Sequence, residues 1–275
     1  MAITNYDGII SARAGGGADD RMFYKAAAAT PVAANWVCHI KSAGNPASAA
    51  YAAASAAGAV MNSSSVGAIP LTAATSGGSK YLLTFAAGAI AGAEVGVVGL
   101  VDVLWAGAGI QTGSSATVTV NGAPSRSTDG VYNKIGVMIS TVLTTAATMT
   151  IWYTDAGGTA TSVDVVIATA GAQGRMLPAA QLYPNTPNGV KSIQSCQIQT
   201  AVTTGAVDIM IFRPLDFIPT VTSYTWVERD MTAQIDGIMK LDTDSSATPG
   251  CLTLVSLHSG TTGRAVTGMI RTVRG

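Results

Sequence analysis

The 275-residue chain is poor in charge, because its 15 basic and 15 acidic residues make up only 11% of it, whereas about 25% is usual for a soluble domain. With no net charge, little opposes association of folded chains. We therefore expect neighbouring subunits to cover much of the surface; the alternative is a neutral surface of Ser, Thr and Gly. The same balance argues against a nucleic-acid partner, which would require a basic stripe.

Three cysteines, Cys38, Cys196 and Cys251, lie far apart in the sequence and form no CxxC pair. An odd number at such spacing predicts neither a disulfide framework nor a zinc site. We expect all three to be small, buried, apolar side chains.

Neither the N-terminal residues nor the most apolar stretch predicts export or membrane insertion. Met1–Asn5, followed by Asp7, lacks the basic region and apolar core of a signal peptide, so we expect synthesis and folding in a cytoplasm. Leu82–Ile110 is interrupted by Glu94 and Asp102, which leaves charge-free stretches too short to span a bilayer. Two buried strands with a turn between them explain this stretch better.

The N-terminal region predicts one short helix followed by extended segments. Ile3–Arg13 has apolar residues at helical spacing and then meets three glycines that would end a helix. Met22–Lys25 and Trp36–Lys41 are short and extended by type, and the second is rich in aromatic and β-branched residues.

Asn45–Gly78 contains no charged residue and is rich in Ala, Gly and Ser. Its Ala47–Ala57 portion could be helical by propensity. With Pro46 and Pro70 as breaks and few large apolar residues, it could equally be an extended arm that lies on a neighbouring subunit. An arm of that kind would be ordered mainly by contacts outside its own fold.

From Lys80 onward the sequence predicts strands, which are short, rich in Val, Ile and Thr, and bounded by Gly, Asn, Asp or Pro. Thr148–Thr154 and Thr159–Ile167 flank Asp155–Gly158, which predicts a hairpin turn. The predicted strands are Val95–Trp105, Ala116–Val120, Tyr132–Ser140, Thr148–Thr154, Ala160–Ile167, Ser192–Thr200 and Ala206–Phe212.

Two Xaa-Pro pairs should end this run of strands. Pro214 and Pro219 cannot donate to a ladder, so Phe217–Asp236 is predicted as a connecting segment in which Tyr224 and Trp226 are packing anchors. A closing hairpin is predicted from two further strands, Cys251–His258 and Ala265–Val273.

Together these elements predict a mainly β fold: a jelly-roll-like antiparallel sandwich with a short N-terminal helix, an extended Ala/Gly/Ser-rich arm and a C-terminal β-hairpin segment. We expect three parts. Residues 1–79 hold the helix and arm, residues 80–219 the sandwich, and residues 220–275 a C-terminal segment packed on the sandwich or on a neighbour.

Five stretches follow one another in a recognisable order: Val101–Gly109, Arg126–Gly130, Met149–Gly158, Gly174–Pro178 and Gly189–Ser195. In type and order they resemble a group of virion structural proteins of tailed phages and prophages. The similarity extends over most of the chain, but the shared elements are packing and turn motifs, and the group offers no catalytic residues to carry over.

The resemblance implies a jelly-roll capsid decoration (cement) protein that forms a homotrimer on the phage major capsid protein, made in the host cytoplasm and located on the virion surface. Such a protein would stabilise the head by bridging capsid subunits. The alternative is a tail, baseplate or fibre component that binds a host surface. Neither role involves a membrane, a nucleic acid or a cofactor.

No residue is predicted to be catalytic, cofactor-binding or metal-binding. Asp242–Thr253 begins like a calcium loop but lacks its Gly and its final Glu. Asp19 and Asp20 fit a helix exit better than an acid/base pair. The only histidines, His39 and His258, accompany no GxSxG motif.

Two further groups of residues leave alternatives open. Arg264, Arg271 and Arg274 make the C-terminal end basic; they could touch an acidic capsid patch, although solvated surface charge is the commoner role. Trp105, Trp152 and Tyr153 could line a glycan site, although core or interface packing is the commoner role of such aromatics.

Overall fold

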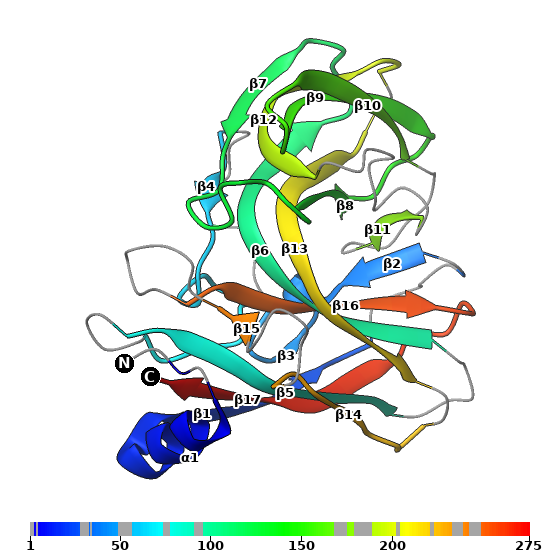
Figure 1. Cartoon of the computed structure of the whole chain (residues 1–275). Coiled ribbons are helices and arrows are strands. Elements are labelled where there is room, and N and C mark those ends of the chain that lie inside the picture. Colours follow the sequence, from blue (N-terminus) through cyan, green and yellow to red (C-terminus); the bar gives the residue numbers. More distant parts are fainter. Residues whose placement is uncertain are drawn as a thin grey trace.

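The computed structural model describes most of the chain as three antiparallel sheets (Figure 1). The described residues are 3, 5–27, 33, 35–48, 57–73, 78–90, 96–167, 175–178, 189–201, 204–220, 223–232, 239–241 and 249–275.

Sheet A lies at one end of the molecule and combines strands from the two ends and the middle of the chain. Its strands are β14 (Val227–Asp230), β5 (Lys80–Ile90), β17 (Ala265–Arg274), β1 (Ala18–Lys25) and β3 (Gly44–Asn45) in that order, with β15 (Met239–Lys240) also paired to β5.

Sheet B is central. Its order is β13 (Ala206–Thr220), β8 (Lys134–Thr141), β11 (Arg175–Pro178), β2 (Asn35–Cys38), β16 (Cys251–His258), β6 (Gly96–Gln111) and β4 (Ala59–Val60). The pairings close into a ring, because β13 pairs with both β8 and β6. The short strand β4 pairs with the part of β6 that lies beyond the pairing of β6 with β16.

Sheet C lies at the opposite end from sheet A (Figure 1). Its order is β10 (Ala160–Ile167), β9 (Ala147–Asp155), β12 (Val190–Ile198) and β7 (Val118–Gly122). The mainly β, antiparallel sandwich predicted from the sequence is confirmed, and so is the hairpin of β9 and β10. Asp155 accepts a hydrogen bond from the Thr159 backbone N–H at 2.8 Å in its turn.

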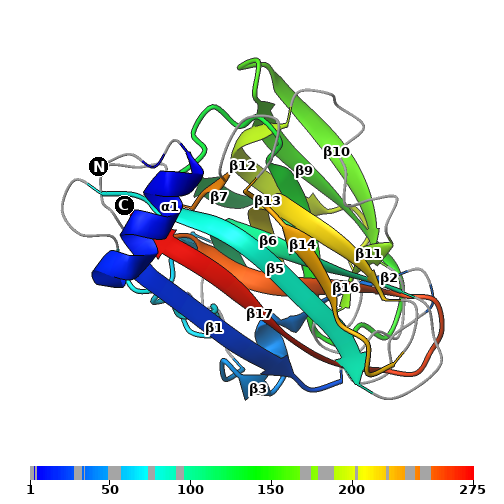
Figure 2. The same cartoon turned by 60° about the horizontal axis from the view of Figure 1, so that its bottom comes forward.

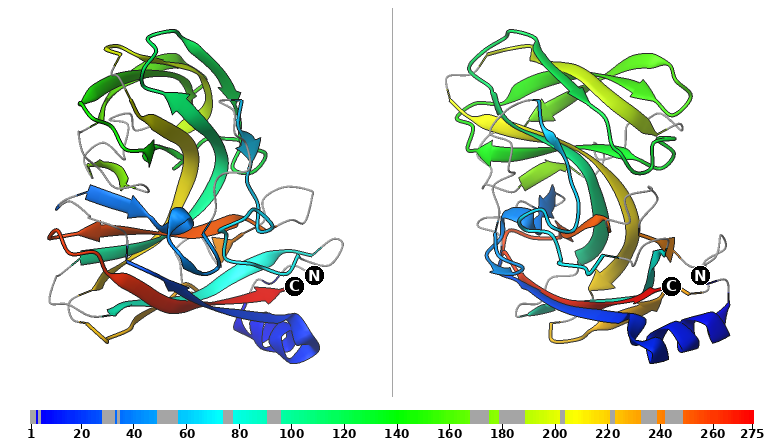
Figure 3. Two further views of the ribbon diagram at one scale, coloured as in Figure 1. Left: turned by 180° about the vertical axis from the view of Figure 1, so that it is seen from behind. Right: turned by 90° about the vertical axis from the view of Figure 1, so that its left-hand side faces the viewer.

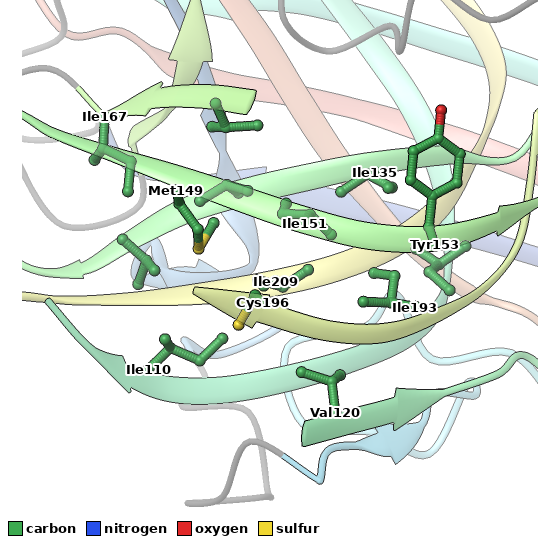
Figure 4. Packing of buried hydrophobic residues seen from close by; sticks show 14 of the residues in the cluster. Ile110, Val120, Ile135, Met149, Ile151, Tyr153, Ile167, Ile193, Cys196 and Ile209 are labelled. Carbon is green, nitrogen blue, oxygen red and sulfur yellow. The ribbon is translucent and has the colours of Figure 1, made fainter. Parts of the chain in front are cut away.

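The long strands β6 and β13 connect the two ends of the molecule (Figure 3). Leu100 on β6 packs in the core between sheets A and B, and Leu104 packs in the core between sheets B and C, part of which is drawn in Figure 4. Val101 points to the other face, into the core inside the ring. Because both faces of these strands are buried, their sequences are apolar almost throughout instead of alternating.

A short N-terminal helix is confirmed as α1 (Tyr6–Ala12), which lies across the outer face of sheet A (Figure 2). The Asn5 side chain caps it by accepting a hydrogen bond from the Gly8 N–H at 2.8 Å. The glycine run continues as a π-helical turn, Arg13–Gly17, and ends it with Gly16 at a φ of 82°. A 3₁₀ turn, His39–Lys41, follows β2.

The prediction that two prolines end the strand run is wrong. β13 continues through Pro214 and Pro219, which pair with Val101 and Val97 of β6. The partner on its other side, β8, ends its pairing at Phe212. Beyond that residue β13 is an edge strand, and an edge strand accommodates proline when the nitrogen faces away from the ladder.

The predicted C-terminal hairpin is also wrong in its pairing, although both strands exist. β16 lies in sheet B and β17 in sheet A. β16 is buried almost throughout, whereas β17 alternates between buried and partly exposed residues. A strand buried on both faces belongs in the central layer, and an alternating strand belongs in an outer one.

Strand pairing crosses the expected boundaries between residues 1–79, 80–219 and 220–275. Sheets A and B each contain strands from all three parts, so these parts do not form separate layers. Residues 57–73 of the expected arm pack on their own fold, because the Met61 N–H donates to the Leu104 carbonyl at 3.1 Å and Ile69 is buried. Residues 49–56 and 74–77 of the predicted arm lie outside the described residues.

Candidate interaction surface

Asp19 and Asp20 occupy opposite faces of β1 and do not form an acid/base pair. Asp19 is buried and forms ion pairs with Lys80 and, at 2.8 Å, with Arg21. Asp20 is exposed and pairs with Arg13 at 2.9 Å. Both carboxylates therefore hold structure together at this edge of sheet A.

The two histidines meet on one serine, a contact that the sequence did not indicate. Ser256 Oγ lies 2.7 Å from His39 Nε2 and 2.8 Å from His258 Nε2, and all three residues are buried. Burial lowers the pKa of His39 to about 3. The adjacent cavity, lined by Ser256, His258 and Arg264, measures about 20 Å³, which suits one water molecule. This cluster is a polar bridge inside the fold.

The three cysteines are buried, as the sequence predicted, and burial raises the pKa of the Cys196 thiol to about 11. Across the part of the chain that is described, no group of three or more metal-ligating side chains comes together. Residues 242–248, which begin the rejected calcium loop, lie outside the described residues.

The three C-terminal arginines do not share one basic patch. Arg264 is buried, Arg271 lies 3.7 Å from Glu228, and Arg274 donates to the Gly16 carbonyl at 3.0 Å.

The aromatic residues considered for a glycan site separate into two environments. Trp105 and Tyr153 are buried in the core between sheets B and C. The Trp105 ring fits against Gly122, where a Cβ would lie 2.6 Å from the indole. Trp152 alone is partly exposed, on the outer face of sheet C.

The surface with the clearest capacity for interaction is the outer face of sheet A, which we call the sheet A face. Phe23 points into the core, so its strand neighbours Met22 and Tyr24 point outward; they are 68% and 44% exposed. Met22 lies opposite Met269 of β17. Tyr24 lies opposite Thr267 in the next outward row.

The connecting segment before β14 extends this face with aromatic residues. Tyr224 is 75% exposed, so the prediction that it is a packing anchor is wrong, whereas Trp226 is 42% exposed and packs on the sheet at Gly88. Gly88 of β5 faces outward, and a Cβ there would collide with the Thr225 carbonyl and lie 2.8 Å from the Trp226 indole. The segment therefore crosses the outer face of the sheet at Gly88.

Helix α1 completes the face at its other end (Figure 2). Ile9 packs with Leu83 beneath the helix, while Tyr6 and Ile10 point outward at 59% and 66% exposure. Between the helix and the apolar row of Met22 and Met269 lies a charged row, in which Asp20 of β1 stands opposite Arg271 of β17 in the strand register. A groove of about 370 Å³ runs here, lined by residues that include Tyr6, Arg13, Leu83, Glu228 and Asp230.

Exposed aromatic and methionine side chains concentrate on this end of the molecule. Among the described residues that are large, apolar and exposed, every aromatic or Met except Tyr132 belongs to α1, β1 or the segment before β14. Scattered exposed apolar residues are normal, whereas a gathered group is typical of interaction surfaces.

No helix among the described residues is both long and apolar enough to cross a membrane. No protein-family model matches the chain, and no curated protein matches it.

The chain has a distant likeness to some solved structures. One is AlgX of Pseudomonas aeruginosa, 18% identical over 34% of this chain and 24% of that chain, with a TM-score of 0.20. Another is a subviral particle of VP2 from infectious bursal disease virus, 9% identical over 93% of this chain and 80% of that chain, with a TM-score of 0.21. The chain thus spans about a quarter of AlgX, and likenesses at these scores establish no shared family.

Proposed function

We propose that this chain is a non-enzymatic structural protein of a tailed-phage virion, and specifically a capsid decoration (cement) protein. In this role it forms a homotrimer and bridges subunits of the major capsid protein on the virion surface. The sheet A face carries the proposal, because it presents Met22, Tyr24 and Trp226 to solvent on a chain with few charges.

The composition of this face suits a protein partner. Interface cores are enriched in Met and aromatic residues, and their rims are polar. Here Met22 and Met269 lie side by side, and the adjacent row carries Asp20 and Arg271. The apolar row would be the buried centre of the contact, and the charged row would set its register.

Two of the stretches that resemble virion proteins are joined in space. Val101–Gly109 forms the middle of β6, and Arg126 begins the second stretch. Arg126 pairs with Asp102 at 2.9 Å inside the fold. These two stretches therefore belong to the interior that supports the outer faces of the sheets. This agrees with the shared motifs being packing and turn motifs. The trimer itself is inferred from the resemblance, and we propose that the sheet A face joins its subunits, so that head binding depends on this face through the trimer.

The test uses particles made without this chain, to which purified protein carrying a gold label is added before electron microscopy. Label on the head shell is the expected result. Met22→Glu places a charge in the apolar row and should reduce head labelling by at least about tenfold, the effect of about 1.4 kcal/mol. Val142→Glu, at an exposed apolar residue away from the face, is the matched control and should label normally. Absence of head labelling would overturn the proposal.

A tail, baseplate or fibre component that binds a host surface is the second candidate. It is favoured by the outer face of sheet C, where Trp152 stands among hydroxyl and amide side chains. Gold label on tails instead of heads would select this candidate.

A further inference from the structure

The outer face of sheet C differs in chemistry from the sheet A face. Trp152 of β9 lies opposite Ser162 of β10 on one side and Ser195 of β12 on the other. Between these small cross-strand neighbours the Trp152 side chain is partly exposed to solvent. No described residue accepts a hydrogen bond from its N–H.

Hydroxyl and amide groups surround this tryptophan in a fixed arrangement. Thr150 and Thr154, two residues away on the same strand, share its face. Gln199 Nε2 donates to Thr150 Oγ1 at 2.6 Å, and Thr150 Oγ1 donates to Asp164 Oδ1 at 2.6 Å. Gln194 supports Thr154 on the other side.

The contact from Gln194 Nε2 to Thr154 Oγ1 measures 2.7 Å. Because this hydroxyl accepts from the amide, its own hydrogen is left to donate outward. The carbonyl oxygens of Gln194 and Gln199 are acceptors on the same face. Hydrogen-bond donors and acceptors therefore lie on both sides of Trp152 along β9.

We propose that this face binds a neutral carbohydrate, with one sugar ring stacked on Trp152. The C–H face of a sugar ring is apolar and packs on an indole, whereas its hydroxyls both donate and accept and so pair with Thr, Ser and Gln. Binding sites of this kind combine an aromatic surface with a few placed polar groups.

The charge on the face selects against other ligands. The outward positions paired with β9 include one acid, Asp164, and Lys191, at the bulge between Val190 and Ser192, is the one basic residue of β12. A single lysine supplies little of the positive charge that nucleic acid and acidic glycans would require. A protein partner would favour the Met and aromatic content of the sheet A face instead.

This inference does not depend on the assembly role, because sheets A and C lie at opposite ends of the molecule (Figure 1). Carbohydrate binding is measured on purified protein without particles. Its failure would leave the head-labelling result untouched, and failure of head labelling would leave carbohydrate binding untouched.

The experiment is calorimetric titration with soluble malto-, cello-, galacto- and chito-oligosaccharides, with sulfated and uronic-acid oligosaccharides as acidic comparators. Soluble ligands keep the measured affinity independent of subunit number. We expect at least one neutral series to bind with a Kd below about 10 mM. Trp152→Ala should weaken that binding by at least about tenfold, and Gln194→Ala should weaken it several-fold.

The matched control is Tyr132→Asn, which removes an exposed aromatic side chain elsewhere on the molecule. Asparagine tolerates the backbone φ of 64° at this position. This variant should bind as the wild type does. Circular dichroism verifies that each variant is folded. Absence of binding to every neutral series, equal binding by Trp152→Ala, or preference for the acidic comparators would overturn the proposal.

Discussion

Arg126 and Asp102 form an ion pair at 2.9 Å in which both side chains are almost completely buried. Asp102 sits in the middle of β6, and Arg126 reaches it from the loop after β7. Arg126 Nη1 also donates to the Met61 carbonyl at 2.6 Å. One side chain thus fastens a long strand, a loop and the segment after β4 to one another.

Arg126→Met should therefore be strongly destabilising. Removing one partner of a buried pair leaves the other charge without compensation, which costs about 3–5 kcal/mol. Urea denaturation measures this as a fall in the free energy of unfolding. The double variant Arg126→Met, Asp102→Asn should recover part of the loss. A loss below about 1 kcal/mol in the single variant would contradict a structural role for the pair.

Stability should fall as the pH is lowered from about 6.5 towards 3. Burial, with smaller contributions from His258 and Lys25, lowers the pKa of His39 to about 3, against about 6.5 in the unfolded chain. Over this range the unfolded chain binds a proton that the folded chain does not, so acid favours unfolding.

Denaturation curves at several pH values test whether His39 causes this loss of stability. His39→Gln should have a shallower pH dependence than the wild type between pH 6.5 and 3, because the buried imidazole is gone. His258→Gln keeps His39 buried, and because burial is the largest cause of the low pKa, this control should retain most of the slope. Identical slopes in His39→Gln and wild type would show that another group governs the effect.

Gly88→Ala should disturb the sheet A face without touching its apolar row. A Cβ at this position would press on the segment that carries Trp226, and overpacking of this kind costs about 1–3 kcal/mol. We expect weaker self-association in light scattering. Gly15→Ala, at a glycine with open space around it, is the control. Unchanged association in Gly88→Ala would mean that the position of Trp226 does not matter.

Local patterns predicted many of the strands well, because the order of apolar and polar residues along a strand reflects which of its faces are buried. Ala160–Ile167 and Cys251–His258 were predicted with the bounds observed for β10 and β16. Partners were harder to predict. β17 pairs with β5 and β1, far away in the chain, and no local pattern encodes a pairing across such distances.

The surfaces were only partly predictable for the same reason. The charge deficit predicted covered surface, but only the register placed Met22 beside Met269. Pro214 and Pro219 masked the continuation of β13, because the sequence does not show that its second neighbour stops at Phe212. Likewise, only pairing shows that Trp152 faces outward between two serines.

The central claim, that the sheet A face joins copies of this chain, is tested most directly by the mass of the purified protein in multi-angle light scattering. Wild-type protein should have three times the 27.7 kDa mass of one chain, and Met22→Glu should shift towards the mass of one chain while Val142→Glu does not. A wild-type monomer, or a Met22→Glu variant that associates as strongly as the wild type, would contradict the account.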